Sequence, residues 1–495
     1  MIHRERFDPR VLTSWPKEFL LTYAIAPLRD EDGKVIVFGS SDARAAAMEI
    51  GMLLDRDVSF VEAEAKDVRR FVMEKYDTGS GRQDAIEELE RDGADVRELE
   101  ELANDAPVVR LVGSFLQKAA EKRASDVHIE PYEDESVIRF RIDGVLSEQD
   151  RLPRGLHPGV VSRIKILGRL DIAQTRLPQD GRIALAMGGR EIDLRVSTIP
   201  TPLGERVVLR LLDRSSVRYG MTDLGLDGET LTRWQELLGQ PHGIILVTGP
   251  TGSGKTTSLY AALETLKSGR VNILTVEDPV EYQLQGIGQV QVNPRINLTF
   301  ASGLRSLLRQ DPDIIMVGEI RDSETAVIAV QAALTGHLVL STLHTNDAAS
   351  APPRLQDMGI ESYLLSSTMR GVMGQRLVRK LCMNCRQPVQ VDRSDARALD
   401  LPEDTHVYRA AGCETCEGVG FKGRLGLFEL MLVDDDVKDM ILARRASGEI
   451  LRAARKKGMK TIKEDGRDKV LRGLTTPSEI IRVTDASAGE EKSSP

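Results

Sequence analysis

Residues 244–256 read Ile-Ile-Leu-Val-Thr-Gly-Pro-Thr-Gly-Ser-Gly-Lys-Thr. An apolar run that leads into Gly-x-x-x-x-Gly-Lys-Thr predicts a buried strand, a glycine-rich phosphate-binding loop (a P-loop) and the start of a helix. The glycines let backbone N–H groups turn toward phosphate oxygens, and the helix N-terminus adds partial positive charge. A glycine turn that matches the pattern by chance is the alternative, but it leaves the strand and the helix unexplained. The expected nucleotide contacts are Gly249, Pro250, Thr251, Gly252, Ser253, Gly254, Lys255, Thr256 and Thr257.

Within this loop, two side chains have expected roles in binding ATP. Lys255 should reach the β- and γ-phosphates, and the Thr256 hydroxyl should bind Mg²⁺. The loop therefore predicts ATP and magnesium as ligands of this chain.

Composition limits what such a protein does with ATP. The chain has 495 residues, a length that suggests about three domains. Its net charge of −9, with 29% charged residues, argues against a protein that coats DNA or RNA. No apolar run approaches the ~18 residues of a membrane span, and residues 1–8 lack the apolar segment of a secretory signal. We therefore expect a cytoplasmic protein that meets a membrane only through a partner.

Changes of pattern along the chain predict its divisions. Glycine and serine at 79–81 mark a flexible linker, and residues 84–102 are rich in acids. The expected divisions are a small α/β domain at 1–76, a linker with an acidic helix at 77–103, a second α/β domain at 104–213, an ATPase core at 222–380, a cysteine-bearing insert at 381–432, a helical region at 433–484 and a disordered tail at 485–495.

Three acids follow apolar strands of the expected core. Glu277 and Glu281 come after the run at 271–276, and Glu319 comes after Ile314–Val317. Ligands of open α/β sheets bind at the carboxyl ends of the strands, where ATP hydrolysis needs a carboxylate to orient water. Glu277 and Glu281 are candidates for that carboxylate, and Glu319 is a candidate Walker B acid that holds magnesium or assists the nucleophile. Solvated acids in polar turns are the alternative for all three.

Histidines and arginines complete the candidate site. His344 follows the strand at 338–343 and could sense the γ-phosphate, whereas His337 precedes that strand and is the weaker candidate. Arginines stabilise charge on a transferred phosphoryl group. Any one of them alone is more simply a surface residue. The candidates are Arg195 and Arg210 in the second domain and Arg305 and Arg309, which lie four residues apart on one helix face.

All four cysteines fall in two Cys-x-x-Cys pairs, separated by 27 residues. A closed structural zinc site with four thiolates fits this spacing, and we expect no catalysis there. An iron–sulfur cluster and a redox dithiol are the other possible uses of such pairs. The expected zinc ligands are Cys382, Cys385, Cys413 and Cys416.

The order of these motifs resembles one family. The P-loop, Glu277–Glu281, Gly318–Asp322 and Gly336–Asn346 follow one another as in the secretion ATPase superfamily of type II secretion and type IV pili. Further passages, together with the cysteine pairs, resemble the general secretion pathway protein E group, which supplies the ATPase of type II secretion. These passages are Arg123–Pro131 and Arg176–Arg182.

The resemblance implies a fold and a set of roles. It implies an α/β chain with a RecA-like P-loop domain, preceded by small α/β domains, that forms a homo-hexameric ring. ATP would lie between the second α/β domain and the RecA-like domain, where Arg195 and Arg210 close onto the phosphates from one side and Arg305 and Arg309 from the other. Glu281 would then polarise water and Glu319 would be the Walker B acid. The zinc insert resembles a family module.

The resemblance also implies a motor. ATP hydrolysis would drive pseudopilus assembly and export of folded proteins across the outer membrane. Residues 1–76 would dock on the cytoplasmic domain of a platform protein at the inner membrane. A type IV pilus extension or DNA-uptake motor is the alternative, and a nucleic-acid translocase is disfavoured by the acidic charge. The chain departs from its relatives at Pro352-Pro353, where a continuous helix is usual.

Overall fold

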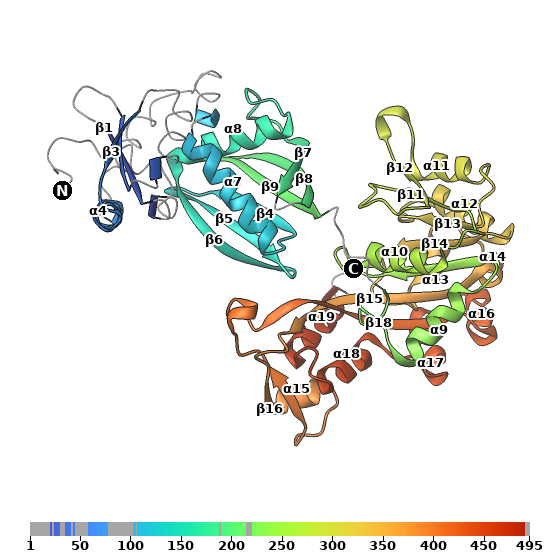
Figure 1. Cartoon of the computed structure of the whole chain (residues 1–495). Helices are drawn as coiled ribbons and strands as arrows, with labels where there is room; N and C mark the ends of the chain where they lie inside the picture. The colour runs from blue at the N-terminus through green and yellow to red at the C-terminus, as the bar shows by residue number, and fades with distance from the viewer. Residues whose placement is uncertain are drawn as a thin grey trace. The chain divides into compact units, whose positions relative to one another are not determined.

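The computed structural model describes residues 20–21, 24–29, 35–40, 43–44, 58–77, 102–104, 106–187, 190–213 and 220–490. The chain divides into two compact units, with the boundary between Asp213 and Arg214 (Figure 1). Most of the predicted linker at 77–103 lies outside the described residues. No helix in the described ranges is long and apolar enough to cross a membrane.

The first unit begins with a small three-stranded sheet of order β1-β2-β3. β1 and β2 are antiparallel, whereas β2 and β3 are parallel. Buried apolar residues of β1, β2 and α4 form its core. The elements are β1 (Ile25–Arg29), β2 (Val35–Gly39), β3 (Val58–Glu62) and α4 (Ala65–Asp77).

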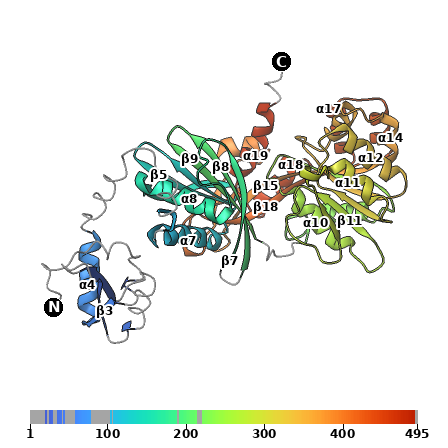
Figure 2. The same cartoon turned by 90° about the horizontal axis from the view of Figure 1, so that it is seen from above.

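A six-stranded antiparallel sheet forms the rest of the first unit, in the order β6-β5-β4-β9-β8-β7. Two helices lie on one face of this sheet and share an apolar core with it (Figure 2). Charged residues such as Asp126 and Arg210 occupy the other face, because successive side chains of a strand point to opposite faces. The elements are α7 (Ala106–Glu121), β4 (Asp126–Pro131), β5 (Glu135–Ile142), β6 (Val145–Pro153), α8 (His157–Gly168), β7 (Gln179–Met187), β8 (Arg190–Thr201) and β9 (Gly204–Asp213).

A seven-stranded sheet organises the second unit, in the order β12-β11-β13-β14-β10-β15-β18. The pairs are parallel except for β15 with β18. β10 is buried along its whole length between β14 and β15, which explains why its sequence is continuously apolar. The strands are β10 (Gly243–Thr248), β11 (Ile273–Glu277), β12 (Gly288–Gln291), β13 (Ile314–Val317), β14 (Leu338–Leu343), β15 (Met369–Leu381) and β18 (Phe421–Leu432).

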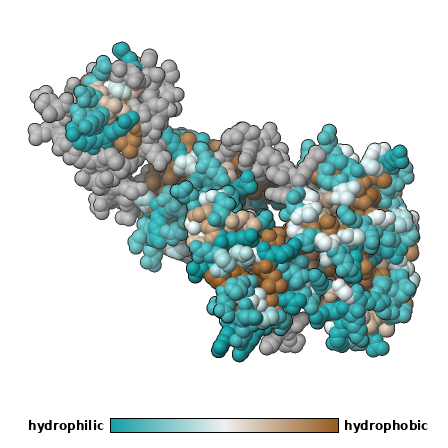
Figure 3. Space-filling view, turned by 60° about the horizontal axis from the view of Figure 1, so that its bottom comes forward, coloured by the Kyte–Doolittle hydropathy of each residue, from teal (hydrophilic) through white to brown (hydrophobic). Residues whose placement is uncertain are grey.

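Helices cover both faces of this sheet, and each face has its own apolar core. Ile244 and Leu246 of β10 belong to one core, whereas Ile245 and Val247 belong to the other. On the face shown in Figure 3 the described surface is mostly hydrophilic, with smaller apolar patches. The helices are α9 (Gly228–Leu238), α10 (Lys255–Leu266), α11 (Phe300–Leu307), α12 (Ser323–Leu334), α13 (Ala351–Asp357) and α14 (Ser362–Thr368).

The two prolines that depart from the family pattern lie in the first turn of α13. Their missing N–H groups are among those that have no partner inside a helix at this position, so the turn accommodates them. Ser350 precedes the helix, and its N–H donates to Asp347 Oδ1 at 2.7 Å. Pro352-Pro353 therefore marks a helix start and does not break a longer helix.

The cysteine-bearing insert is shorter than the predicted range 381–432. β18 (Phe421–Leu432) pairs with β15 from Gly371 to Leu381 and thus belongs to the main sheet. The insert itself comprises the chain between these two strands. It contains a two-stranded sheet of β16 (Gln387–Gln390) and β17 (His406–Arg409), together with α15 (Arg393–Ala398).

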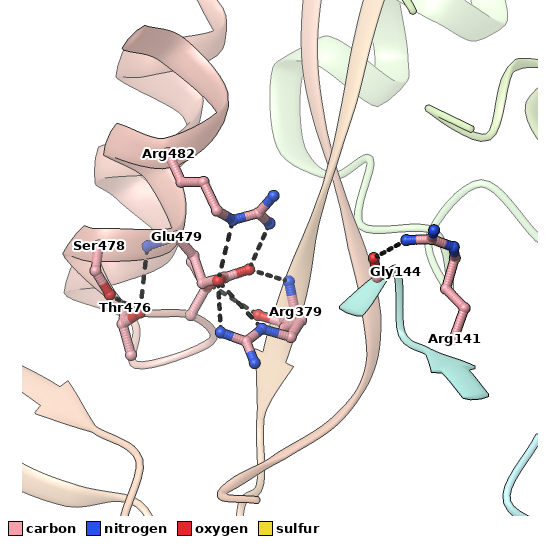
Figure 4. Close-up of polar contacts among 8 residues, drawn as sticks. Arg141, Gly144, Arg379, Thr476, Ser478, Glu479 and Arg482 are labelled. Carbon is pink, nitrogen blue, oxygen red and sulfur yellow. Dashed lines mark hydrogen bonds and ion pairs between the residues drawn. The ribbon is translucent and has the colours of Figure 1, made fainter. Parts of the chain in front are cut away.

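Four helices follow β18, and the last packs against the base of the insert. Glu479 of α19 is 2% exposed and accepts hydrogen bonds from the Arg379 side chain at 2.8 Å and from Arg482 at 2.9 Å (Figure 4). α19 continues to Glu490, so the segment 485–490, predicted to be disordered, is helical. The helices are α16 (Asp435–Leu442), α17 (Ser447–Lys456), α18 (Ile462–Leu471) and α19 (Pro477–Glu490).

Candidate functional site

The P-loop connects β10 to α10 as the sequence predicts. Gly249, Gly252 and Gly254 have φ values of 147°, 79° and 85°, which lie in the range that favours glycine. A Cβ on Gly249 would lie 2.4 Å from the carbonyl oxygen of Gln375, so no larger residue fits there. The loop residues Pro250 and Thr251 are exposed, whereas Thr256 and Thr257 are half-buried in the first turn of α10.

Two features of this loop fit a bound phosphate. The Ser253 hydroxyl is buried and has no hydrogen-bond partner, which leaves a donor for an oxygen anion. Gly252 has open space where a Cβ would be, so a ligand can approach the loop from that side. The residues present therefore match the chemistry of a nucleoside triphosphate.

Lys255 is folded back onto its own loop. Its Nζ donates to the carbonyl oxygens of Gly249 at 2.7 Å and Pro250 at 3.1 Å. Burial lowers the pKa of Lys255 to about 8; the Glu319 carboxylate opposes this shift, and the Arg376 guanidinium adds to it. Phosphate oxygens would be stronger partners for this ammonium group than neutral carbonyl oxygens.

The end of β10 is joined to the loop that follows β14. The hydroxyl oxygens of Thr248 and Thr345 are 2.7 Å apart, and the Thr345 N–H donates to Thr248 Oγ1 at 2.9 Å. Arg376 of β15 is buried and donates to the carbonyl oxygen of Asn346 at 2.7 Å. The loop that carries His344 is thereby held beside the P-loop.

Glu319 and His344 lie near Lys255, at the carboxyl ends of β13 and β14. His344 Nε2 is 3.4 Å from a Glu319 oxygen, and Arg321 forms an ion pair with the same carboxylate. Burial lowers the pKa of His344, and the positive charge of Lys255 lowers it further. A neutral imidazole beside a carboxylate can accept or donate one hydrogen bond to a phosphate or a water.

His337 lies at the opposite end of β14. Its Nδ1 is 2.9 Å from the Ala332 carbonyl oxygen and 3.3 Å from Thr335 Oγ1, both at the end of α12. The structure thus separates the two histidines, and His337 contacts the helix that precedes its strand.

Glu277 is buried at the end of β11 among hydrogen-bond donors of the protein. The Tyr260 hydroxyl donates to it, as do Thr275 Oγ1 at 2.5 Å and Gln289 Nε2 at 3.1 Å. Burial raises the pKa of Glu277, and the neighbouring Glu281 carboxylate raises it further. Because three donors of the protein already bind its oxygens, Glu277 is better suited to position its neighbours than to activate water.

Glu281 is half-buried and close to the same tyrosine. Its backbone N–H donates to the Tyr260 hydroxyl oxygen at 3.3 Å. The negative charges of Glu277 and Glu281 both raise the pKa of Tyr260, after burial. The tyrosine therefore stays protonated and connects the two acids.

Arg305 and Arg309 contact protein groups in this structure. Arg305 pairs with Glu324 of α12 at 2.6 Å, and both side chains are at least half exposed. Arg309 donates to the Arg305 carbonyl oxygen at 2.9 Å and to Ser306 Oγ at 3.2 Å. Each contact is exposed enough to be exchanged for a phosphate at little cost.

Arg195 and Arg210 lie directly opposite each other on β8 and β9 of the first unit. Arg210 also donates to Asp126 Oδ1 at 2.9 Å. Two like charges at paired positions destabilise a sheet unless anions lie near them. Their approach to the nucleotide remains a prediction.

The four cysteines come together as a compact cluster. Sulfur atoms of Cys382 and Cys413 are 3.8 Å apart, and those of Cys385 and Cys416 are 3.7 Å apart. All four lie within 4.8 Å of one another. A tetrahedral zinc ion with Zn–S bonds of ~2.3 Å requires sulfur separations of about 3.8 Å, which these match.

Backbone N–H groups further favour the thiolate form of Cys416. The N–H groups of Cys413 and Gly420 donate to Cys416 Sγ at 3.2 and 3.1 Å. These bonds help to lower the pKa of Cys416 to about 6, although burial opposes the shift. The donor set thus fits a metal ion that binds thiolate sulfur.

Some residues of the site cannot be identified from sequence motifs. Arg376, Gln375 and Tyr260 carry no motif of their own. Ser258 Oγ donates to Gln375 Oε1 at 2.8 Å, which joins α10 to β15. Only the pairing of β15 with β10 brings Gln375 and Arg376 to the loop, and that pairing spans more than a hundred residues of chain.

A family model described as Type II/IV secretion system protein matches residues 101–482. Type II secretion system protein E of Dickeya dadantii is 56% identical over 381 residues, covering 77% of this chain and 76% of the relative. Type II secretion system ATPase E of Vibrio cholerae is 51% identical over 395 residues, covering 79% and 78%. These names favour type II secretion over the pilus alternative.

Solved structures agree with the fold. The Legionella pneumophila ATPase DotB is 22% identical with a TM-score of 0.57, covering 76% of this chain and 96% of that structure. The pilus retraction motor PilT, solved with bound ADP, is 25% identical with a TM-score of 0.51, covering 77% and 98%. The fold class predicted from the sequence is confirmed. The chain belongs to the Type II/IV secretion system protein family, and the relatives described above are type II secretion E proteins.

Proposed function

We propose that this protein is the cytoplasmic ATPase of a type II secretion system and that it couples ATP hydrolysis to pseudopilus assembly. The observation that carries the proposal is the convergence of Lys255, Glu319 and His344 at the carboxyl ends of neighbouring parallel strands. Relatives above 50% identity that are named type II secretion proteins support the choice of machine.

Each residue has a proposed part in the reaction. Lys255 binds the β- and γ-phosphates, Thr256 holds magnesium, and Glu281 orients the attacking water. Glu319 acts as the Walker B acid, and His344 beside it contacts the γ-phosphate. Magnesium, when bound, neutralises charge that develops on the phosphate oxygens.

Domain closure is the proposed step that couples ATP hydrolysis to mechanical work. Arg195 and Arg210 of the first unit, together with Arg305 and Arg309, contact the phosphates in a closed state. ATP binds this state more tightly than the open one and so shifts the equilibrium toward it. In a homo-hexamer at the cytoplasmic face of the inner membrane, these changes act on a platform protein through residues 1–76. The role proposed for the zinc cluster is structural.

Two measurements test the proposal. Purified full-length protein is assayed for phosphate release from Mg-ATP, beside Lys255→Ala; turnover by that variant at the wild-type rate would contradict the P-loop assignment. Full-length protein is also used to capture partners from a lysate of the native bacterium. Recovery of a type II platform protein supports the proposed machine, whereas recovery of a pilus platform protein moves the same motor to pilus extension.

A further inference from the structure

Glu429 of β18 is a buried carboxylate that the proposed mechanism does not use. It is 4% exposed and lies directly opposite Gly374 of β15. A Cβ on Gly374 would lie 2.6 Å from Glu429 Oε1. The space that this glycine leaves empty is therefore the space that the carboxylate occupies.

The two carboxylate oxygens bind two separate segments of the chain. Oε1 accepts a hydrogen bond from the Ala348 N–H at 2.7 Å, and Oε2 accepts one from the Ile462 N–H at 3.3 Å. Ala348 lies in the loop that begins with His344 and leads to α13, whereas Ile462 is the first residue of α18. Glu429 thus joins the nucleotide-side loop to a helix of the C-terminal region.

The loop His344–Ala348 has two other anchors on the P-loop side. Thr345 is held by Thr248, and Asn346 is held by Arg376. Glu429 supplies the third anchor, at the far end of the loop. Each anchor comes from a different strand, so the loop is fixed from β10, β15 and β18 together.

Charged groups around Glu429 set its protonation. Burial and, after it, the Asp347 carboxylate in the loop raise the pKa of Glu429, which is about 7 in total. The Ala348 and Ile462 N–H groups and the Arg376 guanidinium of β15 lower it. Near neutral pH both protonation states of Glu429 are therefore populated. The charged form has two strong acceptor oxygens, and the protonated form has one.

We propose that Glu429 is a positioning residue for ATP hydrolysis, which holds the loop His344–Ala348 in place and links it to α18. This inference rests on the proposed function, since it presupposes hydrolysis at the P-loop. Glu429 does not touch the nucleotide and acts through Ala348 and, by way of the loop, through His344.

The test is Glu429→Gln in the full-length protein. The amide keeps the shape but replaces one acceptor oxygen with a donor group, so one of the two N–H groups loses its partner. Loss of one charge-assisted hydrogen bond should lower kcat about tenfold, while KM for ATP stays within about twofold because the phosphate contacts remain. Hydrogen exchange at Ala348 or Ile462 should become faster.

Glu479→Gln is the matched control. Glu479 is equally buried and also binds β15, but it contacts Arg379 and Arg482 at the base of the insert. It should lower the melting temperature and leave kcat unchanged well below that temperature. An equal loss of kcat in this control would show general destabilisation and would overturn the inference.

A second variant keeps the proposal testable if Glu429→Gln does not fold. Gly374→Ala should displace the carboxylate and lower kcat in the same way. In the wild type, kcat should fall as the pH drops through about 7, because protonation removes an acceptor; a folded Glu429→Gln variant should lack this pH dependence. If the wild type hydrolyses ATP and kcat of Glu429→Gln or Gly374→Ala is unchanged, the inference alone fails. If the wild type does not hydrolyse ATP, the proposed function fails.

Discussion

The ammonium group of Lys255 donates a hydrogen bond of 2.7 Å to the carbonyl oxygen of Gly249, at the start of the loop that ends with the same lysine. The lysine is 9% exposed, and burial lowers its pKa to about 8. Without a phosphate, the ammonium group donates its hydrogen bonds to neutral carbonyl oxygens, and the Glu319 carboxylate offsets only part of the effect of burial. An anionic ligand would restore the charge balance of this site.

ATP affinity is therefore expected to fall as the pH rises through about 8. Below this value Lys255 is protonated and attracts phosphate; above it the folded protein without nucleotide loses the charge. Above this pH the dissociation constant for ATP should rise by up to about tenfold per pH unit. Calorimetric titration of ATP between pH 7 and pH 9.5 measures this, with Lys255→Ala as a weak and pH-insensitive control. Constant wild-type affinity over this range would contradict the prediction.

Replacing Glu281 should separate nucleotide binding from hydrolysis. Glu281→Gln keeps the size of the side chain but cannot act as a base, so kcat should fall about 10²-fold or more while ATP still binds. Glu277→Gln is the comparison, because Glu277 accepts hydrogen bonds from Tyr260, Thr275 and Gln289, so its replacement should change stability as well as rate. Wild-type turnover in Glu281→Gln would show that another group orients the water.

Arg195 should matter more for turnover than for folding. It lies opposite Arg210, which keeps its ion pair with Asp126 when Arg195 is replaced, so the sheet should tolerate the loss of one of two like charges. Arg195→Ala should lower kcat/KM about 10²-fold, with a stability change below about 1 kcal/mol. Arg151→Ala on β6 is a suitable control, because Arg151 is an exposed arginine of the same sheet that pairs with Glu135. Equal activity of the two variants would show that Arg195 is not part of the nucleotide site.

The cysteine cluster should hold about one equivalent of zinc. Cys382→Ser should release the metal and loosen the insert, because three thiolates no longer close the tetrahedral site. Met383→Ser is the control, since Met383 lies in the same knuckle and is 52% exposed. For both variants, the metal content is measured by mass spectrometry, and the looseness of the insert is measured by protease digestion. Full zinc content in Cys382→Ser would contradict a four-thiolate site.

Local motifs predicted the parts of this site that depend on local spacing. The P-loop and the Cys-x-x-Cys pairs are short enough that sequence spacing fixes their geometry. Arg376 and Glu429 could not be found in this way, because they reach the site only when β15 pairs with β10 and β18. The same reason explains the misplaced end of the insert: β18 resembles any apolar strand until its partner is known.

The position of α19 on β15 should depend on one carboxylate. Burial favours the neutral form of Glu479, but hydrogen bonds from Arg379 and Arg482 outweigh it and lower the pKa of Glu479 to about 2. A depressed pKa stabilises the folded state above the ordinary value of 4.5, and this contribution is lost as the pH falls from there toward 2. Because Arg379 belongs to β15 and Glu479 to α19, the charged carboxylate joins the helix to the strand.

Glu479→Gln should therefore destabilise the second unit near neutral pH and less so in acid. At pH 7 the variant loses these charged hydrogen bonds and leaves Arg379, whose side chain is 24% exposed, without its carboxylate partner. This loss should cost about 2 kcal/mol and lower the melting temperature by a few degrees. At pH 3 to 4 the difference from the wild type should narrow, because the wild-type carboxylate then begins to lose its advantage. Glu229→Gln, which removes an exposed partner of Arg233, should change the melting temperature far less at either pH. Equal melting of Glu479→Gln and the wild type at pH 7 would show that α19 is held by its apolar contacts, with Ile480 fully buried among them.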